Sequence, residues 1–97
     1  MLKGFVYLMA SENRRAIYVG VTSDLTKRIT EHKSYAVKGF TRKYNCVNLA
    51  YFEDCAEITL AIQREKQIKG GSRQNKIKLI ERSNPEWKDL SRLVLGS

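Results

Sequence analysis

The chain has 97 residues, of which 42% are hydrophobic and 29% are charged, and its formal net charge is +8; this length predicts one domain over residues 1–97 around one small core. No apolar run reaches the roughly 18 residues that a membrane span needs, and the first residues lack the charge, apolar stretch and cleavage site of a signal peptide. We therefore expect a soluble, cytoplasmic protein with no membrane partner.

The first third of the chain predicts an antiparallel strand pair followed by a helix. Residues 3–9 are apolar and β-prone, and a short polar connection separates them from a second such run at residues 16–21. Ser23 or Asp24 is suited to cap the helix that follows, which we expect to run to about residue 35.

The rest of the chain predicts one more strand and three more helices. The elements expected are a loop or short helix over 37–45, a strand over 46–53, and helices over 56–69, 73–82 and 86–95. Gly70 and Gly71 end the first of these helices. Because both alternating faces of the first strand are apolar, the sheet should be covered on both sides. The fold class expected is α/β, a small three-stranded antiparallel-type sheet flanked by helices.

Basic residues are concentrated in two segments of the chain. Residues 27–43 contain six Lys and Arg against one Glu, and residues 64–82 contain seven against two. Such a balance suits a polyanionic partner, most simply nucleic acid, and the alternative is a basic solvated surface without a dedicated ligand. The candidate nucleic-acid-binding residues are Lys27, Lys38, Arg42 and Lys43.

Three polar residues fall on the apolar stripes of predicted helices. On a helical wheel His32 lies at the centre of the first helix's stripe and Arg28 at its edge, while Glu65 lies within the stripe of the second helix. Burying a charge is costly unless the charge is paired. One interpretation is therefore a core ion pair between Arg28 and Glu65, and the other is a polar cleft that all three residues face.

The second strand carries a further polar side chain. Alternation places Ile17, Val19 and Val21 on one face and Tyr18 and Gly20 on the other. A glycine in a strand lets a ligand or another part of the chain approach closely. A Tyr, an Arg, a His and a Glu in one cleft would provide a proton acceptor, a cation for phosphate charge and an oxygen ligand for a divalent metal.

The two strand sequences carry a resemblance to a known family. Phe5-Val6-Tyr7 and Tyr18-Val19-Gly20 stand about ten residues apart. This arrangement resembles the GIY-YIG nucleases, whose two short strands carry G-I-Y and Y-I-G at such a separation. Arg28, His32 and Glu65 follow in the order in which that family has an inward arginine, a His or Tyr, and a metal-binding glutamate.

The resemblance covers about residues 3–80, with residues 84–95 as a C-terminal helical extension, and it is closest to the small standalone bacterial members. It implies a divalent-metal-dependent endonuclease that hydrolyses DNA phosphodiester bonds. Selectivity for DNA structure or damage and a role in DNA repair or recombination are implied with it. The expected partner is nucleic acid, DNA before RNA, and a protein partner could supply targeting.

The resemblance also assigns roles to the residues that match. Glu65 would hold one Mg²⁺ or Mn²⁺, Tyr18 would take the proton from the attacking water, and His32 would relay that proton or share the role of base. Tyr7 would orient water or phosphate. Arg28 would bind the negative charge that develops in the transition state.

Several positions depart from the family pattern or match it only as candidates. Val21 stands where many members have a lysine, for which Lys43 is the candidate replacement, and Asn75 is a candidate for an active-site asparagine, with Gly20 as support. The missing lysine keeps open a nucleic-acid-binding module with a decayed active site. A small protein-interaction domain with a merely basic surface is the third alternative.

Overall fold

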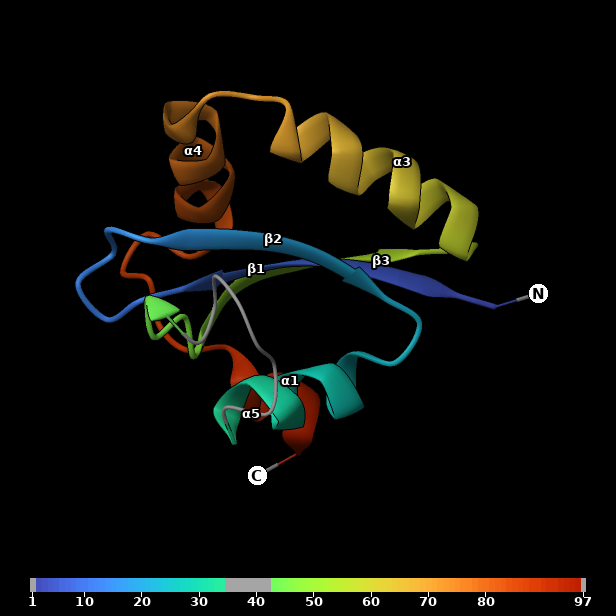
Figure 1. Cartoon of the computed structure of the whole chain (residues 1–97), viewed down its shortest axis with the longest axis horizontal. Coiled ribbons are helices and arrows are strands. Elements are labelled where there is room, and N and C mark those ends of the chain that lie inside the picture. The colour runs from blue at the N-terminus through green and yellow to red at the C-terminus, as the bar shows by residue number, and fades with distance from the viewer. Residues whose placement is uncertain (1, 35–42, 97) are drawn as a thin grey trace.

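A three-stranded antiparallel sheet lies at the centre of the molecule, with helices on both of its faces (Figure 1). The structure is a computed structural model that describes residues 2–34 and 43–96 of the chain. Its elements in chain order are β1 (Gly4–Ala10), β2 (Ile17–Thr22), α1 (Leu25–Lys33), β3 (Asn48–Cys55), α3 (Ile58–Lys69), α4 (Arg73–Ser83) and α5 (Ser91–Leu95). In Figure 1 α3 and α4 cover one face of the sheet, and α1 and α5 cover the other. The predicted fold class is confirmed.

The strand order is β2-β1-β3, and β1 is antiparallel to both of its neighbours. Tyr7 in the middle of β1 stands opposite Gly20 on β2 and opposite Phe52 on β3. The pairing with β3 shifts in register between Leu8 and Met9. β2 is therefore an edge strand of this sheet.

Alternation along the strands fills two separate cores, because successive side chains point to opposite faces. The core between the sheet and α3–α4 contains Val6, Leu8, Val19, Ala61, Ile68 and Ile80. The core on the α1 side contains Tyr7, Met9, Leu25, Ile29 and Leu49. Ile17 and Val21 pack with the first core and Tyr18 with the second, as the alternation predicts.

Side chains at the helix starts explain where two of the helices begin. Asp24 accepts a hydrogen bond from the backbone N–H of Lys27 at 3.0 Å, and Ser72 accepts one from Asn75 at 3.1 Å. β3 begins and ends two residues later than the strand predicted over 46–53. Within the described ranges the longest helix has 12 residues, and no helix is long and apolar enough to cross a bilayer.

The prediction of a helix over 86–95 is wrong for its first half. Trp87 has a left-handed φ of 56°, which interrupts any regular helix. The buried side chain of Asn84 donates to the carbonyl of Ala50 at 3.0 Å and accepts from the N–H of Lys88 at 2.9 Å. These bonds fix residues 84–88 against β3 as a loop, and the last helix begins only at Ser91.

Candidate active site

The pairing of β1 with β2 brings two tyrosines together above one glycine. Tyr7 stands opposite Gly20, and Tyr18 precedes Gly20 by two residues on the same face. A Cβ atom at position 20 would lie 2.4 Å from Cζ of Tyr7 and 2.8 Å from Cε2 of Tyr18. Gly20 therefore provides the space in which both phenol rings lie.

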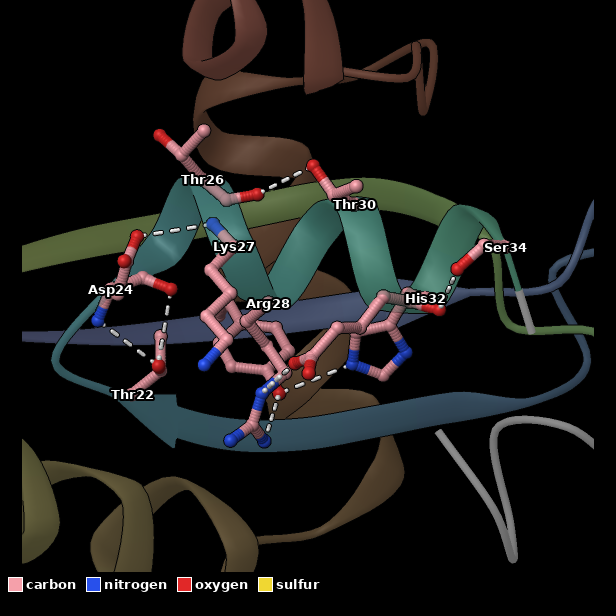
Figure 2. A network of polar contacts seen from close by, with 10 residues as sticks. Thr22, Asp24, Thr26, Lys27, Arg28, Thr30, His32 and Ser34 are labelled. Atoms are coloured by element: carbon pink, nitrogen blue, oxygen red, sulfur yellow. Dashed lines mark hydrogen bonds and ion pairs between the residues drawn. The ribbon is translucent and has the colours of Figure 1, made fainter. Parts of the chain in front are cut away.

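Helix α1 adds an arginine and a histidine to the two tyrosines. Arg28 and His32 are one turn apart and reach from α1 toward the sheet (Figure 2). The Tyr7 hydroxyl lies 3.2 Å from Nε2 of His32, and Arg28 Nη1 donates to the same hydroxyl at 3.5 Å. Glu31 holds the guanidinium from the other side, with Oε1 3.2 Å from Arg28 Nε.

The three aromatic rings of this cluster are in mutual contact. Ring centroids are 5.6 Å apart between Tyr7 and His32, 5.7 Å apart between Tyr18 and His32, and 6.1 Å apart between the two tyrosines. All three arrangements are tilted or edge-on, the geometries that aromatic rings prefer. The predicted cleft residues Tyr7, Tyr18, Arg28 and His32, together with Gly20, are thus gathered in one place.

Burial keeps the inner pair of this cluster uncharged. Tyr7 is fully buried, and burial together with the nearby Tyr18 raises its pKa well above the usual range, although Arg28 opposes the shift. His32 is 2% exposed, and burial followed by the charge of Arg28 lowers its pKa to about 4. At pH 7 Tyr7 and His32 are therefore both neutral, and the Tyr7 hydroxyl is hydrogen-bonded to Nε2 of His32. Nδ1 of His32 is buried without a hydrogen-bond partner in the described part of the chain.

Tyr18 and Arg28 form the outer, partly exposed pair of the cluster. The Arg28 side chain is 36% exposed, and Tyr18 is half-buried on the edge strand. Burial lowers the pKa of the Arg28 guanidinium, but its interactions with Tyr7, Glu31 and Tyr18 raise that pKa by more. Arg28 and Lys27 line a polar hollow of about 330 Å³ between the start of α1 and Thr22. Of the cluster, this pair is what a substrate can reach.

Glu65 lies on α3, across β2 from the cluster. Its side chain is only 13% exposed, and its Oε2 accepts from Lys69 Nζ at 2.8 Å. The pKa of Lys69 is raised, first by its hydrogen bond to Glu65 and least by its electrostatic interaction with Tyr18, while burial opposes the shift. Lys69 therefore lies within electrostatic reach of Tyr18. The interpretation as a core ion pair between Arg28 and Glu65 is wrong, since each pairs within its own helix.

Glu65 fits one kind of metal site and not another. Among residues 2–34 and 43–96, no group of three or more His, Cys, Asp or Glu side chains is placed to hold a metal ion. Mg²⁺ commonly keeps several waters and uses only one or two carboxylates plus substrate phosphates. A lone, half-buried carboxylate such as Glu65 suits that kind of site, whereas an all-protein cage does not fit these residues.

Residues 3–78 match the family model described as the GIY-YIG catalytic domain. The chain belongs to the GIY-YIG family. It is 35% identical to a UPF0213 protein of Syntrophus aciditrophicus over 89% of this chain and 98% of that protein. It is 33% identical to one of Staphylococcus haemolyticus over 84% of this chain and 98% of that protein. The solution NMR structure of a UPF0213 protein from Bacillus halodurans has a similar fold, with a TM-score of 0.58 at 23% identity, covering 94% of this chain and 96% of that one.

The remaining predicted residues of this GIY-YIG domain lie away from the tyrosines or outside the described ranges. Lys43 lies beside residues 11–13, with its Nζ 5.4 Å from the ring centroid of Tyr44. Val21 stands at the far end of β2 and packs with the α3–α4 core, so Lys43 does not replace a lysine there. Asn75 lines a groove between α3 and α4. Lys38 and Arg42 lie outside the described residues.

Sequence reasoning missed two charged partners of the GIY-YIG residues. Glu31 orients Arg28 from three positions along α1, and Lys69 pairs with Glu65 from four positions along α3. Helix neighbours at these spacings face each other. The three-residue spacing of Glu31 from Arg28 and the four-residue spacing of Lys69 from Glu65 could therefore have identified both partners from the sequence.

Proposed function

We propose that this chain is a divalent-metal-dependent endonuclease that hydrolyses DNA phosphodiester bonds. A catalytic domain of the GIY-YIG family has a nuclease-type fold, and that membership suggests nucleic-acid binding. The observation that carries the finer proposal is the setting of Tyr18. It is half-buried on the edge strand, and it interacts electrostatically with Arg28 on α1 and with Lys69 on α3.

Tyr18 is the group we assign as proton acceptor for the attacking water. A general base must reach the water that it deprotonates. Tyr7 is fully buried against His32, so it cannot meet a substrate, whereas Tyr18 is partly exposed. Arg28 and Lys69 both interact electrostatically with Tyr18.

Arg28 is assigned to the phosphate. A guanidinium presents several N–H donors in a planar fork that matches phosphate oxygens. Arg28 binds Glu31 through Nε and Tyr7 through Nη1, and these two contacts fix the plane of the fork. Preorganised donors of this kind stabilise charge that develops in the transition state.

Tyr7 and His32 act on the reaction through these outer groups. Their hydrogen bond and ring contacts hold Arg28 and Tyr18 in position. The pKa of His32, about 4, is too low for it to hold the proton near pH 7, so we assign His32 to positioning Tyr7 and Tyr18. Tyr7 is accordingly a positioning residue rather than a direct ligand of water or phosphate.

Glu65 would hold the metal, Mg²⁺ or Mn²⁺, as its protein carboxylate. When bound, such an ion supplies Lewis-acid neutralisation of phosphate charge and of the leaving oxygen. Lys69 forms an ion pair with Glu65, so a bound ion would compete with Lys69 for that carboxylate.

The substrate is assigned more coarsely than the reaction. Lys27, on the polar hollow beside Arg28, would contact the phosphate backbone, which gives affinity but little sequence information. We propose DNA before RNA, recognition of DNA structure or damage rather than sequence, a role in repair or recombination, and targeting by a protein partner. A binding module with a decayed site is the second candidate, favoured by Val21 at the position of the family lysine.

A cleavage panel tests this proposal. The purified chain is incubated with single-stranded, nicked, flapped, branched and duplex DNA and with RNA, in Mg²⁺, Mn²⁺ or EDTA. We expect metal-dependent cutting that Glu65→Gln abolishes and that Glu57→Gln, at a partly exposed glutamate in the N-cap position of the same helix, retains. Salt-sensitive binding without cutting by the wild type would instead support the binding module.

A further inference from the structure

The groove between α3 and α4 collects basic side chains that the proposed catalytic site does not use. It has a volume of about 310 Å³, and its charged lining residues within the described part of the chain are all cations: Arg64, Lys76, Lys78 and Arg82. The side-chain amides of Gln67 and Asn75 also line it. It is therefore a surface of hydrogen-bond donors and positive charge.

The two acidic residues of the 64–82 segment are turned away from this groove. Glu65 pairs with Lys69 toward the β2 side of α3, and Glu81 accepts a hydrogen bond from Trp87 Nε1 at 2.7 Å. The segment's excess of basic residues is thus sorted by the fold onto one surface. A helix whose charged side chains only contact solvent would not need its acidic and basic residues on different surfaces.

Arg64 is built into the wall of the groove. Glu53 on β3 accepts from Arg64 Nε at 2.9 Å and from Nη2 at 2.8 Å, while Gln67 accepts from Nη1 at 2.7 Å. Most of the hydrogen-bond donors of the Arg64 guanidinium are therefore used within the protein. The groove charges left for a ligand are then those on α4.

Lys78 and Arg82 are the groove cations most available to a ligand. Both are exposed and stand one helical turn apart, which places their Cβ atoms about 5–6 Å apart. Like charges at this spacing destabilise a helix, and a polyanion lying along the groove would neutralise them. A row of cations of this kind suits a phosphate backbone.

We propose that the α3–α4 groove is a second binding site for the phosphate backbone of nucleic acid, separate from the catalytic site. Arg64 ties the groove to β3, whereas Tyr18 lies on β2 at the opposite edge of the sheet. Arg28 lies on α1, which covers the face of the sheet opposite α3 and α4 (Figure 1). The groove therefore holds a different segment of nucleic acid from the one at Tyr18, as in a branched substrate. The inference concerns binding and does not depend on cleavage.

The test compares two double variants that remove the same charge. Lys78→Ala with Arg82→Ala empties the groove of its free cations, and Lys88→Ala with Arg92→Ala removes two exposed cations outside it. Binding of fluorescent duplex and branched DNA is measured by anisotropy across a salt series in EDTA, which prevents cutting. Thermal melting checks that both variants fold as the wild type does.

We expect the groove variant to lose about tenfold or more in affinity and to reduce the salt slope by about two, since each phosphate contact contributes about one. The control variant should stay close to the wild type. Equal losses in both variants, or no loss in the groove variant, would overturn the proposal. Loss of binding to phosphatidylglycerol vesicles with unchanged DNA binding would overturn it in favour of a lipid surface.

Discussion

A methyl group on Gly20 would lie 2.5 Å from the hydroxyl oxygen of Tyr7, the residue opposite it on β1. Tyr7 is fully buried, so its ring has no open space into which to move. The lack of a side chain at Gly20 therefore allows Tyr7 to reach His32 and Arg28.

Gly20→Ala is expected to destabilise the fold by about 1–3 kcal/mol, the usual cost of overpacking a core. Gly71→Ala is the matched control, because a Cβ there would meet its nearest neighbour, the Ile68 carbonyl oxygen, at 3.4 Å, close to ordinary contact. Urea unfolding measures both. Equal stability of the two variants would contradict the packing described here.

His32 predicts a loss of stability in mild acid. Its pKa in the folded protein is about 4, whereas an unfolded histidine titrates near 6.5. Below pH 6.5 the unfolded chain takes up a proton that the folded chain refuses, so stability present above that pH is lost as the pH falls toward 4. From pH 7 to pH 5 the loss should be about 2 kcal/mol.

The check is urea unfolding at pH 7 and pH 5 for the wild type and for His32→Gln. The variant keeps a polar side chain near Tyr7 but has no group that titrates in this range. Its stability should change much less between the two pH values. A wild type that is equally stable at both would show that His32 is not held neutral by burial.

Asp89 is predicted to stabilise the fold through its backbone contacts more than through its ion pair. It accepts from the N–H of the buried Leu49 at 3.0 Å and from the hydroxyl of Ser91 at 2.6 Å, and it also pairs with Lys33. Asp89→Ala leaves a buried N–H unsatisfied, at a cost of about 1–3 kcal/mol.

Lys33→Ala removes only the ion pair of Asp89, which is partly exposed, and should cost about 0–1 kcal/mol. Thermal or urea unfolding of both variants gives the comparison. If Lys33→Ala were the more damaging substitution, the ion pair and not the backbone contact would hold the C-terminal segment on β3.

Arg28→Lys is expected to lower the single-turnover cleavage rate by about 100-fold or more while leaving the fold intact. Lysine keeps the charge but lacks the planar fork that Tyr7 and Glu31 orient. Glu31→Gln, which weakens only that orientation, should have a smaller effect. Wild-type rates for Arg28→Lys would mean that the guanidinium acts as a simple charge.

The sequence predicts the fold well where hydrophobic alternation is strong. The apolar faces of β1 and β2 and the cap at Asp24 are local features, and the structure agrees with them. The last helix was mispredicted because Asn84 gains its bonds from Ala50, a partner 34 residues away. A local sequence pattern does not show that the side chain of Asn84 hydrogen-bonds to a strand far away in the sequence.

The candidate site also combines local features, which the sequence shows, with long-range contacts, which it does not show. The wheel correctly turns His32 inward, because one polar residue on an apolar stripe is visible in sequence. It overstates the apolar stripe of α3, where Ile62 is 39% exposed and the buried line runs through Ala61 and Ile68. The partner of Arg28 is Glu31, three positions along the same helix, whereas the place of Glu65 across the sheet depends on long-range packing that the sequence does not show.

The most direct test of the central claim is the single-turnover cleavage rate of Tyr18→Phe beside that of Tyr51→Phe, at saturating Mn²⁺. Tyr51 bonds to Glu53 at 2.5 Å and packs with the α3–α4 core on the opposite face, so its hydroxyl is a matched control. Loss of a general base predicts a rate lower by about 100-fold or more for Tyr18→Phe, with Tyr51→Phe near the wild type. Tyr18→Phe cutting at the wild-type rate would contradict the assignment of Tyr18 as the proton acceptor.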